Sequence, residues 1–172
     1  MDIVIRPARP EEYPVIGEIT ARAYLGDGLL DFGESDAYLG RLRDVESRAA
    51  VAEVLAAVEG DRVLGSVTFV ADSGPMADFA RPGEAEIRML AVAREARGRG
   101  AGEALVRACV ARARALEGCT RLVLSTQRTM RGAHRLYERV GFTRTPDRDW
   151  NPLPELDDIR LLTYELAFRH AA

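Results

Sequence analysis

One stretch of the chain decides the fold: EAEIRMLAVAREARGRGAGEALVRACVARARALE, residues 84–117. Residues 84–92 are rich in β-favouring and apolar side chains, which predicts a strand. The turn that follows carries Gly98, Gly100 and Gly102, and a helix with apolar residues at helical spacing then runs to about Glu117. Glycine can adopt positive φ and let a ligand approach the backbone, and the first N–H groups of a helix attract anions. This segment therefore predicts an anion site suited to a pyrophosphate.

Two arginines of the same turn, Arg97 and Arg99, add positive charge that can pair with phosphate. The glycines alternate and none stands at 103 or 105, so the dinucleotide fingerprint Gly-x-Gly-x-x-Gly does not fit. The turn also follows strands that look antiparallel, whereas a dinucleotide site belongs to a first βαβ unit. An ordinary solvated helix start has the same composition, so the turn alone assigns no function.

The rest of the chain alternates between strand and helix patterns, without an internal repeat or a flexible linker. The other elements, in chain order, are a strand at 3–5, a helix from Pro10 that Gly26–Gly28 ends, a helix at about 36–48, strands at 51–58 and 63–70, a strand at 121–126, a helix capped by Thr129 and stopped by Gly141, and strands at 142–144 and 160–168. Three loops separate them: an exposed-looking one from Leu29 to Gly33, a long one at 72–83 and a Pro-rich one at 146–154. This order predicts an α/β or α+β fold, a mixed sheet with helices on its faces.

The composition is that of a globular protein of 172 residues, 47% hydrophobic and 30% charged, which predicts one domain. The net charge of −3 argues against a nucleic-acid binder, which needs a basic surplus. No apolar run approaches the ~18 residues that span a bilayer, and the first residues do not resemble a signal peptide. Two cysteines and two histidines make no metal framework. We therefore expect a reduced, cytoplasmic protein that binds neither membrane nor metal.

All basic residues are arginines, since the chain has no lysine. The absence of lysine excludes Schiff-base chemistry on a lysine and a Walker A phosphate loop. It also excludes acetylation of the chain's own lysine side chains.

Two motifs carry a resemblance to a known family. Leu90–Val92 followed by Arg97–Gly102 resembles the acetyl-CoA motif, Arg/Gln-x-x-Gly-x-Gly/Ala after an apolar strand, of the GCN5-related N-acetyltransferase (GNAT) superfamily. Residues 133–142, AHRLYERVGF, resemble the second signature of that family, and Arg6–Ala8 before the first helix is also typical. The resemblance covers essentially the whole chain. It implies a single GNAT domain over 1–172, with a central mixed six- to seven-stranded sheet flanked by about four helices.

The resemblance also implies how acetyl-CoA, the co-substrate, is bound. Backbone N–H groups of the turn would hold the pyrophosphate; these belong to Arg97, Gly98, Arg99, Gly100, Ala101 and Gly102. The backbone of Leu90 and Val92 would bind the pantetheine arm, in a gap where this strand splays from the one at 121–126. Two positions depart from the family pattern: Arg94 replaces a common proline, and Met130 replaces a common asparagine, for which Thr129 or Gln127 are candidate substitutes.

The implied chemistry is direct attack of an amine on the thioester, without a metal. The amine must lose a proton and the thiolate must gain one, so the reaction calls for a base and an acid. We predict Tyr137 as the acid, since a phenol with a pKa of about 10 keeps its proton at neutral pH, and a main-chain N–H near Leu90 as the oxyanion donor. We predict Glu86 as the base, with Arg88 on the same face lowering its pKa. A core role for Tyr137, a surface ion pair for Glu86 and a water relay to a distant carboxylate stay open.

The acceptor is left open by the sequence. In the family, the first two helices, their loop and the last strands shape the acceptor pocket; here these parts carry Asp27, Asp31, Glu34, Asp36, Asp147, Asp149, Glu155, Asp157 and Asp158, with Phe32, Tyr38 and Trp150 as aromatic residues. An acidic rim with aromatic walls suits a small cationic amine, although the acidic surface of an acidic protein is the more ordinary explanation. We therefore expect an N-acetyltransferase for a small amine. The alternatives are a protein N-terminal or lysine acetyltransferase and a regulatory acyl-CoA-binding module. The last strands often pair between subunits in this family, which implies a homodimer.

Overall fold

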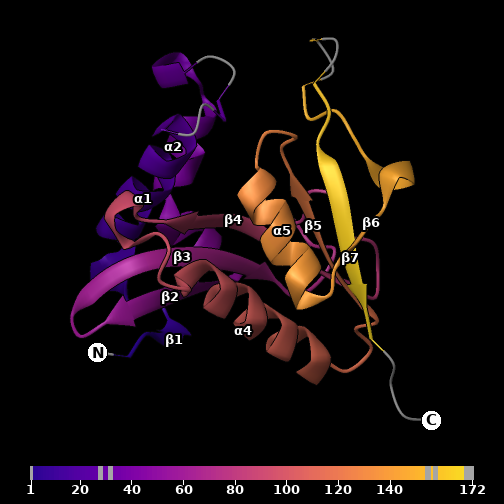
Figure 1. Cartoon of the computed structure of the whole chain (residues 1–172), viewed down its shortest axis with the longest axis horizontal. Helices are drawn as coiled ribbons and strands as arrows, with labels where there is room; N and C mark the ends of the chain where they lie inside the picture. Colours follow the sequence, from indigo (N-terminus) through magenta and orange to yellow (C-terminus); the bar gives the residue numbers. More distant parts are fainter. Residues whose placement is uncertain (1, 27–28, 31–32, 154–155, 157–158, 169–172) are drawn as a thin grey trace.

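The computed structural model describes residues 2–26, 29–30, 33–153, 156 and 159–168. They form a seven-stranded mixed sheet with the order β1-β2-β3-β4-β5-β7-β6 (Figure 1). Neighbouring strands are antiparallel except β4 and β5, which are parallel. The strands are β1 (Val4–Pro7), β2 (Glu53–Glu59), β3 (Arg62–Val70), β4 (Glu84–Val92), β5 (Arg121–Thr126), β6 (Thr143–Arg144) and β7 (Leu162–Ala167). The predicted bounds of β4 and β5 are confirmed.

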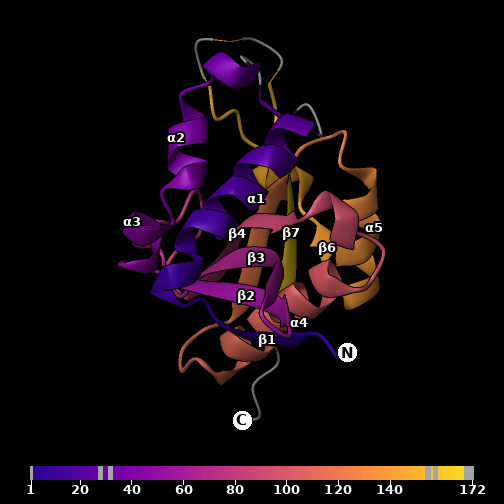
Figure 2. The ribbon, with the colours of Figure 1, turned by 90° about the vertical axis from the view of Figure 1, so that its left-hand side faces the viewer.

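Five α-helices lie within the described residues, one more than the resemblance implied. They are α1 (Tyr13–Gly26), α2 (Tyr38–Arg43), α3 (Val45–Ala49), α4 (Ala101–Ala115) and α5 (Arg131–Val140). Short 3₁₀ turns add η1 (Pro10–Glu12), η2 (Gly33–Ser35), η3 (Arg94–Ala96) and η4 (Pro146–Arg148). Helices α1–α3 cover one face of the sheet, and α4 and α5 cover the other (Figure 2).

The helix expected at 36–48 is divided at Asp44, whose backbone leaves the helical region at φ −85° and ψ 71°. The Asp44 side chain accepts a hydrogen bond from the Ser47 N–H at 3.2 Å, so this residue caps α3. The prediction of one continuous helix is therefore wrong, because a capping aspartate interrupts it. The helix expected from Thr129 is also capped differently: Met130 is the N-cap of α5 and makes no side-chain capping bond.

The main hydrophobic core fills the space between the sheet and helices α4 and α5. From β4 it takes Ala85 and Ile87, and from α4 it takes Leu105, Val106 and Cys109, all of them buried. The alternate residues of β4 face away from this core, and three of these residues are charged: Glu84, Glu86 and Arg88. Among the described helices, none is long and apolar enough to cross a bilayer.

Candidate functional site

Strands β4 and β5 pair over only part of their length. Their parallel register runs from Glu84 opposite Arg121 to Ile87 opposite Leu124 and then stops, while Ser125 and Thr126 pair with β7 instead. Residues 88–92 consequently pair with β3 alone. The two parallel strands separate at this point, as the family resemblance implied.

A β-bulge in β4 coincides with this separation. The register with β3 shifts between Ser66 opposite Ala91 and Thr68 opposite Arg88. Met89 lies in the bulge with φ at +54°, the one positive value for a non-glycine residue in the described part of the chain. Backbone strain of this kind persists where the surrounding structure enforces it, and it often marks a functional site.

The glycine-rich turn has a geometry that fits an anion. Gly98 and Gly100 have φ of +81° and +85°, and a Cβ built at either position would meet no atom within 4 Å. Gly100 is the N-cap of α4 and provides no side-chain cap, so no capping side chain occupies the first N–H groups of that helix. Donors of this kind, at the positive end of a helix, can hold a pyrophosphate.

The charged side chains around this turn are mostly paired. Arg99 forms an ion pair with Glu59, and Glu103 in the first turn of α4 pairs with Arg107 and Arg139. The acidic charge of Glu103 is thereby offset next to the anion site. Arg97 lines an open groove of about 1280 Å³ between α1 and this turn.

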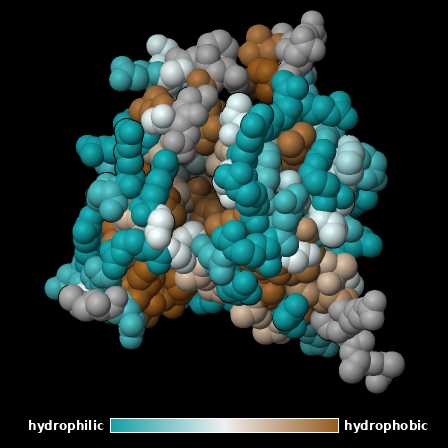
Figure 3. Space-filling model, viewed as in Figure 1, coloured by the Kyte–Doolittle hydropathy of each residue, from teal (hydrophilic) through white to brown (hydrophobic). Residues whose placement is uncertain are grey.

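A second, smaller cavity of about 380 Å³ lies where β4 and β5 separate, beside α1 and α2. Its β4 wall is formed by Ile87, Arg88 and Met89, and its β5 wall by Ser125 and Thr126. The remaining lining residues are Tyr24, Leu29, Leu30, Asp36, Tyr38, Arg41, Asp78, Gln127, Met130, Trp150, Pro152, Leu153 and Leu161. Figure 3 shows a hollow with apolar atoms at its floor between the α1–α2 side and α5, with hydrophilic residues on both sides.

The loop after α1 forms part of this cavity. Leu29 was expected on an exposed loop, but only 6% of it is exposed, and it lines the cavity together with Leu30. The Gln127 side chain donates a hydrogen bond to the Leu29 carbonyl at 2.6 Å, and the His134 ring contacts the Gln127 carbonyl at 2.9 Å. Gln127 thus ties the end of β5 to this loop. Met130 lines the cavity and accepts a contact from the Thr126 hydroxyl at 3.5 Å.

The acidic residues expected around the acceptor are only partly brought together. Asp36 and Asp78 line the cavity, whereas Asp149 pairs with Arg144 at 2.8 Å and Glu34 is exposed outside the lining. Asp147 is also exposed and outside the lining, while the predicted aromatic residues Tyr38 and Trp150 belong to it. The other predicted residues, Asp27, Asp31, Phe32, Glu155, Asp157 and Asp158, lie outside the described residues.

Tyr137 lies on α5, which covers the face of the sheet opposite to α1 and α2 (Figure 2), and is only 4% exposed. Its ring packs edge-on against Phe142 and tilted against Tyr164, with centroids 5.9 Å apart in both pairs. Burial raises the pKa of Tyr137 well above its usual value, so the phenol keeps its proton. Tyr137 does not line the cavity.

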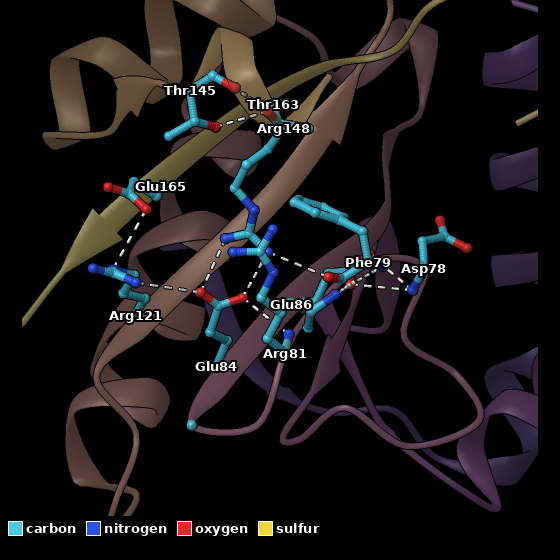
Figure 4. A network of polar contacts seen from close by, with 12 residues as sticks. Asp78, Phe79, Arg81, Glu84, Glu86, Arg121, Thr145, Arg148, Thr163 and Glu165 are labelled. Atoms are coloured by element: carbon cyan, nitrogen blue, oxygen red, sulfur yellow. Dashed lines mark hydrogen bonds and ion pairs between the residues drawn. The ribbon is translucent and has the colours of Figure 1, made fainter. Parts of the chain in front are cut away.

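Glu86 is fully buried, with 0% exposure, and does not line the cavity. Its carboxylate accepts hydrogen bonds from the backbone N–H groups of Asp78, Phe79 and Ala80 at 3.0–3.2 Å (Figure 4). Burial raises the pKa of Glu86, contrary to the expectation that Arg88 lowers it. The role of Glu86 as a base therefore stays a prediction, and its carboxylate is already occupied by the loop before β4.

A buried ion pair next to Glu86 ties the end of the chain to the same loop. Glu84 and Arg148 are 4% and 7% exposed in their side chains, and two nitrogens of Arg148 donate to the two oxygens of Glu84 at 2.9 Å (Figure 4). Arg121 approaches the same carboxylate at 3.7 Å. Sequence reasoning missed this pair; the alternation of charges at 84, 86 and 88 along a strand with an apolar opposite face was the available signal.

No group of three or more His, Cys, Asp or Glu side chains within the described residues is arranged to hold a metal ion. Cys109 and Cys119 are both buried and form no disulfide.

Comparison with protein families matches residues 16–142 to the model described as the Acetyltransferase (GNAT) family. A comparison with curated protein sequences found no match.

Several solved structures share the fold over nearly the whole chain. The Salmonella typhimurium protein yncA, solved with its cofactor acetyl-CoA, aligns with a TM-score of 0.72 and 22% identity over 99% of this chain and 96% of its own. A ribosomal-protein-alanine N-acetyltransferase from Brucella melitensis has a TM-score of 0.71 and 22% identity, over 96% and 99%. A GCN5-related N-acetyltransferase from Kribbella flavida has a TM-score of 0.71 and 23% identity, over 96% and 98%. At these identities the likeness establishes the fold.

Proposed function

This chain belongs to the GNAT acetyltransferase family, and we propose from that premise that it transfers the acetyl group of acetyl-CoA to the amine of a small molecule. The observation that carries the proposal is the cavity of about 380 Å³ at the separation of β4 and β5. Pockets that take small ligands are concave, mostly apolar and fitted with a few polar groups. This cavity combines Tyr24, Tyr38 and Trp150 with the carboxylates of Asp36 and Asp78.

The residues of the glycine-rich turn fit the pyrophosphate of acetyl-CoA. Positive φ at Gly98 and Gly100, open space beside both and an uncapped α4 N-terminus are the features that such an anion requires. In this proposal the N–H groups of 97–102 hold the pyrophosphate. The bound co-substrate supplies the thioester carbonyl that the amine attacks.

The strand separation supports the placement of the pantetheine arm. Leu90 and Val92 belong to the part of β4 that has no β5 partner, and both are partly exposed. Their backbone groups are proposed to bind the arm as an additional strand would, next to the bulge at Met89. A main-chain N–H in this bulge is also the proposed donor to the oxygen that becomes negative during the reaction.

Tyr137 is proposed to give its proton to the departing sulfur. It lies on α5, which covers the face of the sheet opposite to α1 and α2 (Figure 2), and its position beside the sulfur is what the family resemblance implies. Its raised pKa keeps it protonated until the thiolate forms, as a general acid requires. The homodimer remains a prediction from the family resemblance, and the cytoplasmic location remains a prediction from the composition.

A screen of amines with acetyl-CoA, read as thiol release, tests this proposal. The panel holds small primary amines, amino acids and peptides with free N-termini or lysines. We expect turnover with members of the first two groups that fit the cavity. Turnover of peptides alone would instead favour the protein-directed activity, and tight acetyl-CoA binding without any turnover would favour the regulatory module.

A further inference from the structure

Asp78 is a charged side chain that no sequence pattern pointed to and that reaches the cavity from the loop before β4. The Asp78 Oδ2 atom forms an ion pair with Arg88 Nε at 3.0 Å, and the Asp78 side chain is 30% exposed. Within the described residues Oδ1 has no hydrogen-bond partner. Arg88 is fixed in turn, since it donates to the Met76 carbonyl at 2.9 Å and to the Tyr38 hydroxyl at 2.8 Å. One oxygen of Asp78 is thus held in place and the other is available.

The backbone of this loop is held by hydrogen bonds to β4. Three consecutive N–H groups, those of Asp78, Phe79 and Ala80, point to the buried Glu86 carboxylate. Figure 4 shows that the Asp78 carboxylate points away from Glu86 while its N–H points toward it. These three backbone hydrogen bonds to a buried carboxylate fix the loop firmly, although the loop lies at the surface.

Aromatic stacking fixes the loop from the other side. The Arg148 guanidinium lies 4.9 Å from the Phe79 ring centroid and donates to the Phe79 carbonyl at 3.3 Å. Phe79 in turn stacks on Trp150, with centroids 6.4 Å apart, and Trp150 lines the cavity. The segment that carries Asp78 is therefore clamped between β4 and the C-terminal part of the chain.

We propose that Asp78 binds the ammonium group of the acceptor in this cavity and takes its proton, and that Glu86 is the positioning residue that holds Asp78 there. This inference rests on the proposed function and changes the assignment of the base within it. Asp78 meets the acceptor directly, whereas Glu86 acts only through the backbone of 78–80.

The charges around Asp78 suit this role. Burial raises the pKa of Asp78, and the cations Arg88 and Arg41 oppose that rise. The other titratable groups near it are Tyr38 of α2, Tyr24 of α1 and Glu86 of β4. The net rise brings the carboxylate closer to the range in which a base accepts a proton at neutral pH.

The proton balance is complete with groups already named. Asp78 Oδ1 accepts one proton from the acceptor ammonium, which frees the nitrogen lone pair, and later passes this proton to solvent. When the new C–N bond forms and the C–S bond breaks, the nitrogen gives up a second proton. Tyr137 supplies a proton to the departing sulfur and recovers one from the nitrogen. The products are the amide, the thiol and one proton in solvent.

The test compares Asp78→Asn with Glu86→Gln, using an acceptor found in the amine screen and the pH dependence of kcat/KM as the readout. We expect Asp78→Asn to lower kcat/KM about 10²–10⁴-fold at pH 7. In this variant the rise of kcat/KM with pH should follow the fraction of acceptor that is neutral amine. The activity should therefore recover in part at high pH. Glu86→Gln should lower kcat/KM less and should keep the rise with pH that reports ionisation of Asp78. Acetyl-CoA affinity, measured by calorimetry, should stay unchanged in both.

Asp72→Asn is the matched control, because Asp72 is an exposed carboxylate of the same loop outside the cavity. It should keep the wild-type profile. The inference would be overturned, and Glu86 restored as the base, if the rise of kcat/KM that reports ionisation of a protein carboxyl disappeared in Glu86→Gln and persisted in Asp78→Asn.

Two further outcomes separate the inference from the proposed function. Wild-type protein that turns over no amine defeats the proposed function and the inference together, whereas wild-type turnover with an unchanged Asp78→Asn profile defeats the inference alone. Should Asp78→Asn fail to fold, wild-type protein is assayed with two acceptors of different amine pKa. If kcat/KM rises at the same pH with both acceptors, and still does so in Glu86→Gln, the result supports Asp78 as the base. If the rise moves with the pKa of the amine, the assignment of Asp78 is overturned.

Discussion

The two halves of β4 belong to one continuous strand but lie in opposite environments. From Glu84 to Ile87 the strand pairs with β5, and Glu86 and Ile87 also pair with β3. The acidic side chains of this half are satisfied by Arg148 and by backbone N–H groups. From Arg88 to Val92 it pairs on one edge, contains the bulge at Met89 and borders the cavity. The closed half thus provides rigidity, and the open half provides the space and free backbone groups that ligands need.

The largest expected effect is on the reaction proposed to take place at the open half. Tyr137→Phe should lower turnover about 10²–10⁴-fold, because the hydroxyl that protonates the leaving sulfur is lost while the ring packing stays. Acetyl-CoA affinity should hardly change, since the proton is transferred only late in the reaction. Steady-state kinetics and calorimetry measure the two quantities. Tyr164→Phe removes a hydroxyl from the neighbouring ring and should keep wild-type turnover; equal losses in both variants would return Tyr137 to a packing role.

Next in size is a change in the closed half. Arg148→Met should lower the free energy of unfolding by about 3–5 kcal/mol, since it removes the nearest and most buried cation from the buried Glu84 carboxylate. Urea unfolding measures this loss. Arg139→Met breaks the exposed pair with Glu103 and should leave the midpoint unchanged. A stable Arg148→Met protein would show that the clamp contributes little to the rigidity of this half.

A smaller effect is expected at the turn beyond the open half. Gly100→Asp should weaken CoA binding about 10–100-fold, because like charges a few ångströms apart near a protein surface repel by a few kcal/mol. Gly100→Asn is the matched control: asparagine has a similar size, carries no charge and tolerates the left-handed φ of +85° about as well. Calorimetric affinities that are equal in the two variants would place the pyrophosphate elsewhere.

The smallest effect distinguishes the two buried glutamates by pH. Burial opposes ionisation of Glu84, but hydrogen bonds from Arg148 and Arg81 hold its pKa below the usual value. Its contribution is therefore complete above a pH of about 4.3 and is lost as pH falls through the lowered pKa. Burial raises the pKa of Glu86, so the stability that involves Glu86 falls as pH rises from about 4.3 through the raised pKa.

Urea unfolding between about pH 3 and pH 7 measures both slopes in wild type, Glu84→Gln and Glu86→Gln. We expect Glu84→Gln to flatten the loss on the acidic side and Glu86→Gln to flatten the fall toward neutral pH. Slopes of the same sign for the two residues would contradict the contrast between their environments.

The sequence by itself determined the local features of the site. The bounds of β4 and β5, the positive φ at Gly98 and Gly100 and the end of α5 at Gly141 follow from neighbouring residues, because backbone conformation depends on local sterics. The two family motifs lie in these elements. Family membership and the mixed sheet were accordingly predictable before any coordinates were known.

Only the tertiary structure decided which side chains meet. Glu84 finds Arg148 across 64 positions of sequence, and Arg88 finds Tyr38 across 50. Leu29 is buried in the wall of a cavity that α1, α2 and the C-terminal part of the chain form together. Glu86 lies on the strand face that was expected, yet the loop at 78–80 occupies its carboxylate and brings Asp78 to the cavity. Burial and charge pairing depend on partners far away in the chain, and a pattern of near neighbours carries no information about them.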